Sequence, residues 1–373
     1  MAQQIIFKPE LHSFATAREF AEAFALGEGD LILTNEFIYE PFFAPLGLRA
    51  EVLFQEKYGA GEPTDVMTDA ILDEIERRGC RRIVAIGGGT VVDIAKVAAV
   101  SNGQGVDALY DAMPALEKRR ALVIVPTTCG TGSEVTNIAV LARTKLGTKL
   151  GMVSPAMFAD QAVLIPELLT TLPFRFFATS SIDALVHAVE SALSPNATDF
   201  TRLLSERAIE LILRGYRVIA AEGEAARMPL LADFLLAANF AGLAFGTAGC
   251  GAVHALSYPL SGKYHVAHGE SNYAMFTGVL RTYAALAPDS EALARVNAQL
   301  AALLDCPAGE VNTALDALLG AIMPKKPLHD YGVTEADCAD FARSVITEQQ
   351  RLMRNALVPL DEAAVERIYR ALL

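Results

Sequence analysis

Short aliphatic runs alternate with amphipathic segments along the first half of the chain. Runs of Leu, Ile and Val predict β-strands at residues 31–34, 52–54, 82–86 and 122–126. Residues 64–78 repeat apolar side chains at a helical period, and Gly79 marks the end of that helix. Strands that alternate with helices are typical of an α/β domain with a mainly parallel sheet.

The second half of the chain loses the strand pattern from about residue 178. Long helical patterns replace it at residues 201–221, 225–244, 291–304, 310–322 and 334–355. We find no internal repeat and no flexible linker between the halves. The pattern therefore predicts an α/β domain over residues 1–178 and an all-helical domain over residues 179–373, closely packed with a cleft between them.

Two glycine-rich loops follow predicted strands of the first domain. One is Gly87-Gly88-Gly89-Thr90, and the other runs from Pro126 to Glu134. Glycines let a backbone approach a ligand closely, and a helix that opens after such a loop offers free N–H groups to a pyrophosphate. The Gly triplet matches no standard nucleotide motif and by itself is more often a tight turn. Two such loops at the carboxyl ends of parallel strands predict a nucleotide site.

Residues 180–190 predict a helix that begins at Ser180 or Ser181, either of which is a suitable N-cap. Asp183 and His187 are four residues apart, so both side chains lie on one face and can reach one metal ion. A pair with this spacing is more often a surface pair, or a buried histidine held by a carboxylate.

A second segment, residues 251–270, adds candidate ligands to this pair. Three of the six histidines of the chain lie in it: His254, His265 and His268. On one straight helix His254 and His268 would stand about 21 Å apart. Pro259 and Gly262 lie between them and predict that the helix ends there and that the chain turns back. With Asp183 and His187, these two histidines would offer one oxygen and three nitrogens, a set that suits Fe²⁺ or Zn²⁺.

Composition and charge limit the partners. The net charge is −13, which argues against binding to nucleic acid or to an anionic membrane. The five cysteines are scattered, so they predict neither disulfides nor a thiolate zinc site but reduced, cytoplasmic thiols. Residues 234–256 contain no charged residue, yet their polar residues and glycines predict a buried central helix followed by a ligand-bearing helix rather than a membrane span.

Five separated motifs, in this order and spacing, resemble those of the iron-dependent (group III) alcohol dehydrogenase family: Gly87-Gly88-Gly89-Thr90-x-x-Asp93-x-Ala95-Lys96, Pro126-Thr127-Thr128-x-Gly130-Thr131-Gly132-Ser133-Glu134, Asp183-Ala184-x-x-His187-Ala188-x-Glu190, Gly251-x-x-His254 and His268-Gly269. The resemblance covers nearly the whole chain. It implies a Rossmann-like dinucleotide domain followed by an all-helical domain that carries the metal.

The resemblance also implies roles for individual residues. The metal ligands would be Asp183, His187, His254 and His268. The coenzyme NAD would contact Gly87, Gly88, Gly89, Thr90 and Asp93 at the pyrophosphate, Thr127, Thr128, Thr131 and Ser133 at the nicotinamide side, and Lys149 at a ribose. Asn35 stands where NAD-preferring members often have Asp, which leaves NADP open. Tyr258 stands where many members have a second histidine, so the proton would pass through Tyr258 or His265, unless the tyrosine only packs and the histidine is a surface imidazole.

Four further runs are similar to the members that act on 4-hydroxybutyrate: Leu33–Phe37, Phe54–Gly59, His254–Pro259 and Gln349–Leu352. The expected reaction is hydride transfer between NAD(H) and a small primary alcohol or aldehyde, most closely 4-hydroxybutyrate and succinate semialdehyde. The alternatives are a dehydrogenase of the same family for a neutral alcohol or diol, a dehydroquinate-synthase-like lyase, and a non-catalytic sensor. Lys263, Arg143 and Arg351 are available to bind the substrate carboxylate, although such side chains are more often solvated or ion-paired. A homodimer or larger homo-oligomer is expected.

Overall fold

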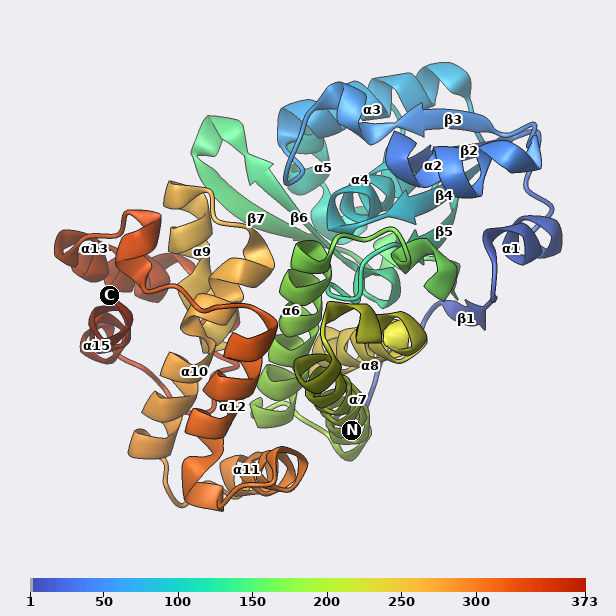
Figure 1. The fold of residues 1–373 in the computed structure, drawn as a ribbon. Coiled ribbons are helices and arrows are strands. Elements are labelled where there is room, and N and C mark those ends of the chain that lie inside the picture. Colours follow the sequence, from blue (N-terminus) through green and yellow to red (C-terminus); the bar gives the residue numbers. More distant parts are fainter. Residues whose placement is uncertain (1–2) are drawn as a thin grey trace. The chain divides into compact units, whose positions relative to one another are not determined.

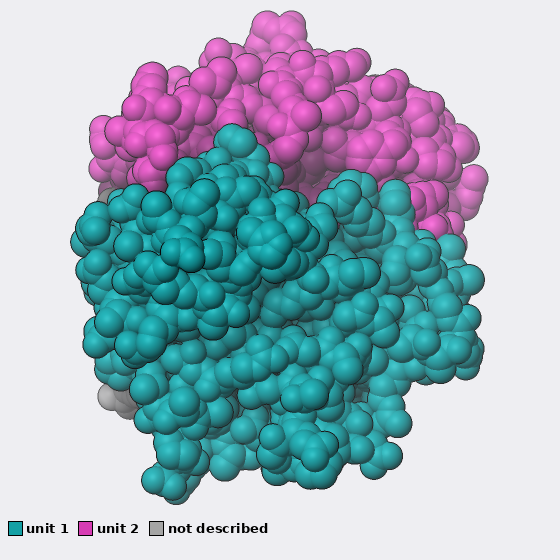
Figure 2. Space-filling model, turned by 60° about the vertical axis from the view of Figure 1, so that its left-hand side comes forward, with its two compact units in different colours: residues 1–6, 173–373 teal, residues 7–172 magenta. Residues whose placement is uncertain are grey.

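The computed structural model describes residues 3–373, and the chain divides into two compact units (Figure 2). One unit is Phe7–Leu172, and the other joins Met1–Ile6 to Pro173–Leu373. The described N-terminal residues hydrogen-bond within the helical unit, because the Ile6 amide donates to Thr247 Oγ1 at 3.0 Å and Thr198 Oγ1 donates to the Gln4 carbonyl at 2.6 Å. The units thus divide at residues 172/173, whereas the hydrophobic pattern placed the boundary at 178/179 and gave the first residues to the α/β domain.

A six-stranded parallel sheet forms the centre of the unit Phe7–Leu172, the α/β unit. Its order is β1 (Glu10–Ser13), β8 (Gln161–Leu164), β5 (Ala121–Pro126), β4 (Arg82–Gly87), β2 (Asp30–Thr34) and β3 (Glu51–Phe54). The four predicted strands are confirmed. The sequence prediction missed two strands of four residues each, β8 and the mostly polar and exposed β1.

Apolar residues on both faces of this sheet explain the continuous aliphatic runs. Along β2, Leu31 and Leu33 face one hydrophobic cluster, and Ile32 faces the other. The first cluster includes residues of α3 (Asp65–Arg78), α4 (Gly89–Val100) and α5 (Val106–Asp111); the second includes residues of α1 (Ala17–Ala23) and α2 (Glu36–Phe42). The predicted helix 64–78 is confirmed as α3, with Gly79 in the left-handed region at its end.

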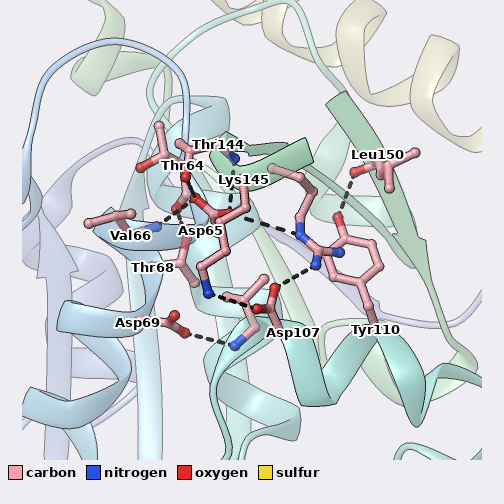
Figure 3. A network of polar contacts seen from close by, with 12 residues as sticks. Thr64, Asp65, Val66, Thr68, Asp69, Asp107, Tyr110, Thr144, Lys145 and Leu150 are labelled. Atoms are coloured by element: carbon pink, nitrogen blue, oxygen red, sulfur yellow. Dashed lines mark hydrogen bonds and ion pairs between the residues drawn. The ribbon is translucent and has the colours of Figure 1, made fainter. Parts of the chain in front are cut away.

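An antiparallel hairpin that the sequence prediction missed adds to this unit: β6 (Ile138–Arg143) and β7 (Thr148–Val153). A polar network ties it to α3 and α5 (Figure 3). The buried Asp65 carboxylate accepts from the Thr144 amide and hydroxyl at 2.9 and 2.7 Å. Arg143 lies over the Tyr110 ring and pairs with Asp107. The guanidinium group of Arg143 therefore helps to hold the hairpin against α5.

The helical unit, which contains Pro173–Leu373, has helices and no strand among its described residues (Figure 1). The α-helices are α6 (Phe174–Leu193), α7 (Asp199–Glu222), α8 (Leu231–Ala248), α9 (Ala252–Tyr264), α10 (His268–Leu286), α11 (Glu291–Leu304), α12 (Val311–Ile322), α13 (Glu335–Glu348), α14 (Gln350–Met353) and α15 (Glu362–Leu372). Helix α6 is buried without interruption from Ser181 to Leu193 and packs against α7, α8 and α10.

Two of the predicted helices have different bounds. The helix expected from residue 225 begins only at Leu231, after a 3₁₀ segment that contains Pro229, because a proline disfavours the α conformation in the residue before it. The helix expected over residues 334–355 is interrupted at Gln349.

One helical segment, Glu224–Ala248, is long and apolar enough to cross a membrane. More than half of its most apolar window is buried, and α8 packs against α6 and α7. A core helix has the same composition. The two helices expected for residues 234–256 are present, because α8 ends at Ala248 and α9, which carries His254, begins at Ala252.

Two predictions about helix ends are wrong. Helix α6 begins at Phe174, and Ser181 lies inside it, where its hydroxyl donates to the Phe177 carbonyl at 2.8 Å instead of capping the helix. Helix α9 continues through Pro259 and Gly262 and ends at Tyr264, followed by the C-cap His265, whose φ is 54°. The chain nevertheless turns back before α10, so the expected return of His268 occurs a few residues later.

Candidate metal centre and coenzyme loops

Four side chains from three helices converge in the helical unit. Asp183 and His187 come from α6, His254 from α9, and His268 is the first residue of α10. One ligand atom from each lies within 4.8 Å of the others. The first three are buried and His268 is half-buried. The structure thus brings the predicted ligands together, and their role as ligands stays a prediction.

Neighbouring side chains fix how the imidazoles point. His254 Nδ1 lies 2.5 Å from Glu190 Oε2, and the other Glu190 oxygen accepts the Val253 amide at 2.6 Å. A carboxylate at Nδ1 favours a proton there, which leaves the lone pair on Nε2 for a metal. The His187 ring stacks on the Phe245 ring with centroids 4.3 Å apart. The sequence motif contained Glu190, but only the fold shows its partner.

The donor set fits a divalent transition metal. One carboxylate and three imidazoles are the ligands that Fe²⁺ and Zn²⁺ accept, whereas Ca²⁺ and Mg²⁺ require more oxygen atoms. Burial raises the pKa of Asp183, but the charges of His187, His268 and His254 outweigh burial and lower it. The group is therefore a carboxylate in a buried place, where a cation would be a favourable partner.

The sequence prediction missed Asn272, which is fully buried beside these ligands. Its Nδ2 lies 2.7 Å from Asp183 Oδ1, 3.1 Å from His254 Nε2 and 3.2 Å from His268 Nε2. Asn272 follows His268 by four residues on α10, so both side chains lie on one helix face. That spacing was the signal available in the sequence.

The two candidates for proton transfer differ in position. The half-buried Tyr258 ring lies 6.2 Å from the His268 ring, measured between centroids. His265 is exposed and is the C-cap of α9. The structure therefore places Tyr258 beside the ligand cluster, and it records no contact of His265 with the four ligands among the described residues.

The glycine triplet connects β4 to α4 in the α/β unit. A side chain at Gly87 would meet Val91 at 2.6–2.9 Å, so this glycine allows the helix to start close to the strand. Gly88 and Gly89 lie against Thr128 and Thr131 of the second loop. The two predicted loops are therefore neighbours at the carboxyl end of the sheet.

Asp93 and Lys96 of α4 hold the second loop in place. Asp93 Oδ1 accepts from Ser133 Oγ at 2.9 Å, and Oδ2 accepts the Val140 amide at 2.9 Å. The fully buried Lys96 donates to Ser133 Oγ, Thr136 Oγ1 and the Ile138 carbonyl at 2.6, 3.0 and 2.8 Å. Burial raises the pKa of Asp93 and lowers the pKa of Lys96 to about 8. In this structure the predicted coenzyme residues Asp93 and Ser133 bond to each other.

The remaining predicted coenzyme residues also have protein partners. Thr90 Oγ1 donates to the Gly61 carbonyl at 2.9 Å, and Lys149 pairs with Glu62. The Thr127 amide donates to the Gly87 carbonyl at 3.1 Å. Asn35 lies at the end of β2, next to the strand that carries the glycine loop.

Two features define the class of protein. One is a parallel sheet with two glycine-rich loops at the carboxyl ends of its strands, and the other is a cluster of one carboxylate and three imidazoles. Together they are typical of a metal-dependent dehydrogenase that uses a dinucleotide. The model of the iron-containing alcohol dehydrogenase family matches residues 4–166, and the model of the C-terminal part of the Fe-containing alcohol dehydrogenase family matches residues 177–373. The chain therefore belongs to the iron-containing alcohol dehydrogenase family and is an oxidoreductase.

Individual relatives agree with this family. The chain is 45% identical over 364 residues to the 4-hydroxybutyrate dehydrogenase of Clostridium kluyveri, covering 98% of both chains. It is 33% identical to the long-chain-alcohol dehydrogenase 1 of Geobacillus thermodenitrificans, covering 90% of this chain and 88% of the relative. The solved sulfoacetaldehyde reductase of Bifidobacterium kashiwanohense, in complex with NAD⁺, shares the fold with a TM-score of 0.85 at 24% identity, over 100% of this chain and 99% of the other.

Proposed function

We propose that this chain interconverts 4-hydroxybutyrate and succinate semialdehyde, with NAD(H) as the hydride carrier and Fe²⁺ as the bound metal. The convergence of Asp183, His187, His254 and His268 carries the proposed chemistry. The 45% identity to a 4-hydroxybutyrate dehydrogenase over 98% of both chains supports the substrate. The name of the family supports iron, and Zn²⁺ would fit the same donors.

In this proposal the helical unit binds the reacting alcohol. The metal, when bound, supplies a Lewis acid that stabilises the alkoxide from which hydride leaves. Glu190 keeps His254 Nε2 aimed at the ligand cluster, and Asn272 holds the Asp183 carboxylate. Tyr258 stands beside His268 and is the residue we assign to proton transfer.

The loops of the α/β unit bind the coenzyme in this proposal. Gly88 and Gly89 let the pyrophosphate approach the N-terminus of α4, where the first helical N–H groups have no intrahelical acceptor. Thr127, Thr128 and Thr131 line the neighbouring loop. Asp93 and Lys96 hold that loop in position, because their side chains are hydrogen-bonded to the loop and to β6.

The deciding experiment is a steady-state assay of metal-stripped protein reloaded under argon with Fe²⁺ or Zn²⁺. We expect NADH formation that depends on the metal. The kcat/KM for 4-hydroxybutyrate should be roughly 10- to 100-fold above that for 1-butanol, because one hydrogen bond to the charged carboxylate contributes about that factor. His187→Ala should abolish metal-dependent turnover, and the exposed His265→Ala serves as the matched control.

Each contrary result corrects a different part of the proposal. Equal or better turnover of 1-butanol would exclude the hydroxy acid as the preferred substrate and favour a neutral alcohol. Turnover that persists in stripped protein would exclude the metal role. A loss of activity in His265→Ala would move the proton transfer away from Tyr258.

A further inference from the structure

The carboxyl ends of three adjacent strands meet at the edge of the sheet that carries the glycine loop. In register, Thr34 of β2 pairs with Ile86 of β4 on one side and with Phe54 of β3 on the other. The residues that follow these strands are therefore neighbours. The glycine triplet begins at Gly87, the last residue of β4; Asn35 follows β2, and Glu56 comes two residues after β3.

A carboxylate is held in place beside the end of β2. Asn35, whose exposed fraction is 9%, donates from Nδ2 to Glu56 Oε2 at 2.9 Å and to Gln55 Oε1 at 3.2 Å. The other Glu56 oxygen accepts the backbone N–H of Glu36, the first residue of α2, at 2.6 Å. Each carboxylate oxygen thus has one donor, and each can accept another because it has a second lone pair. The Glu56 residue is exposed, so a ligand can reach it.

We propose that Glu56 is the residue that selects NAD over NADP, an inference that rests on the proposed coenzyme site. A dinucleotide with its pyrophosphate at Gly87–Gly89 extends its adenosine ribose toward the end of the adjacent strand, where an acidic residue accepts the ribose 2′-hydroxyl in Rossmann-type sites. The end of β2 offers the neutral Asn35, and the charge comes from Glu56, which is held by that asparagine.

The charge explains the selection. A ribose 2′-hydroxyl donates to the Glu56 carboxylate in a charge-assisted hydrogen bond. A 2′-phosphate brings its own negative charge to the same place and is repelled. The carboxylate already has two protein donors, so it is held in position before the coenzyme arrives and loses little freedom on binding.

A purely structural role for Glu56 is the competing explanation, because the carboxylate also lies at the N-terminus of α2 and would stabilise that helix. Glu56→Gln separates the two roles. Glutamine has nearly the same size and can still accept the Glu36 N–H with its one oxygen, but its NH₂ group cannot accept from Asn35 and it carries no charge. A structural role predicts equal changes in the affinities for both coenzymes.

The experiment measures the Kd of NADH and of NADPH by fluorescence titration of the metal-loaded protein. We expect wild type to prefer NADH, and Glu56→Gln to lower the NADH-to-NADPH affinity ratio about 10- to 100-fold, with most of the change in NADPH. Glu56→Ala should lower the ratio in the same direction. Glu51→Gln is the matched control, because it removes one negative charge at the amino end of the same strand; its ratio should stay within about twofold of wild type.

The results also separate this inference from the proposed function. An unchanged affinity ratio in both Glu56 variants, in protein that oxidises 4-hydroxybutyrate with NAD, would overturn the role of Glu56 alone. An equal fall of the NADH-to-NADPH affinity ratio in Glu51→Gln would show a general effect of negative charge and would also overturn the role of Glu56. Wild type that binds neither coenzyme would overturn both the proposed function and this inference.

Discussion

At the scale of single residues, one buried amide connects three of the four candidate ligands. Asn272 Nδ2 is a donor, whereas Asp183 Oδ1 is an acceptor and the facing imidazole nitrogens can be acceptors. An amide nitrogen does not bind a cation, because its lone pair is delocalised into the carbonyl. With an ion at the imidazoles, the lasting partner of Asn272 is therefore the Asp183 carboxylate, which it orients.

Replacing Asn272 with Leu should weaken metal binding about 10- to 100-fold, the usual cost of removing a group that orients a ligand. Leucine has a similar volume but no N–H group. Chelator competition against Co²⁺-loaded protein measures the Kd, and the Co²⁺ absorption spectrum reports any change in the ligand set. Ser271→Ala is the control, because the buried Ser271 hydroxyl donates to the Val266 carbonyl and not to a ligand.

A double-mutant cycle tests whether Asn272 acts through Asp183. The effect of Asn272→Leu on the Kd should largely disappear in an Asp183→Asn background, where the charged acceptor is gone. Additive effects, or an unchanged spectrum and Kd in Asn272→Leu, would argue that the amide only fills space.

At the scale of elements, the buried side chain of Lys96 joins α4 to the loop after β5. Lys96 has three hydrogen-bond partners, one in each of Ser133, Thr136 and Ile138. Its burial lowers its pKa to about 8, whereas an unfolded chain would keep the pKa near 10.5. The unfolded state therefore binds more protons between these values, and the contribution of Lys96 to stability rises with pH through that window.

Lys96→Met removes this titration. The free energy of unfolding of wild type minus that of the variant should increase by about 2 kcal/mol from pH 7.5 to pH 9.5, since each pKa unit is worth about 1.4 kcal/mol. Urea unfolding at both pH values measures the difference. Lys118→Met, at a half-buried lysine paired with Asp160, is the control for the loss of a lysine charge elsewhere in the same unit. A difference that is constant with pH would contradict a lowered pKa for Lys96.

At the scale of the whole molecule, the candidate ligands connect helices that are far apart in the sequence. Asp183 and His268 belong to α6 and α10, which pack together, and His254 belongs to α9, which packs on α10. An ion at this point would join all three helices. It would bind the folded chain in preference to the unfolded one, in which the ligands are not gathered.

Removing the metal should therefore loosen the helical unit selectively. At free metal about 100-fold above Kd, binding contributes about 2.7 kcal/mol to stability. Hydrogen exchange followed by mass spectrometry should show faster exchange in α6, α9 and α10 after chelation, with little change in β2, β4 and β5. The His187→Ala variant should show no such response to metal. A uniform increase over the whole chain would contradict a local role of the ion.

Charge acts on the same scale. The net charge of −13 leaves no overall attraction to polyanions, and a small substrate or coenzyme must be held by local groups. The cytoplasmic location and the homo-oligomer expected from the sequence stay predictions.

The sequence by itself determined the parts that depend on short-range patterns. Aliphatic runs predicted four of the six strands of the parallel sheet, and a helical period with Thr64 and Gly79 at its ends predicted α3. The spacing of Asp183 and His187, with the second histidine cluster, identified the four side chains that converge. These features can be predicted from the sequence because the hydrophobic period, the helix caps and the i, i+4 distance each depend on a few consecutive residues.

The tertiary structure decided the rest. Asn35 and Glu56 are 21 residues apart, and Glu190 and His254 are 64 apart, so their contacts depend on strand register and helix packing. The turn before α10 came at His265 instead of Pro259, because the packing of α9 kept the helix intact beyond its proline. Short strands such as β1 and β8 form only where a neighbouring strand supplies their hydrogen bonds. Contacts of this kind join distant parts of the chain, and no local pattern records them.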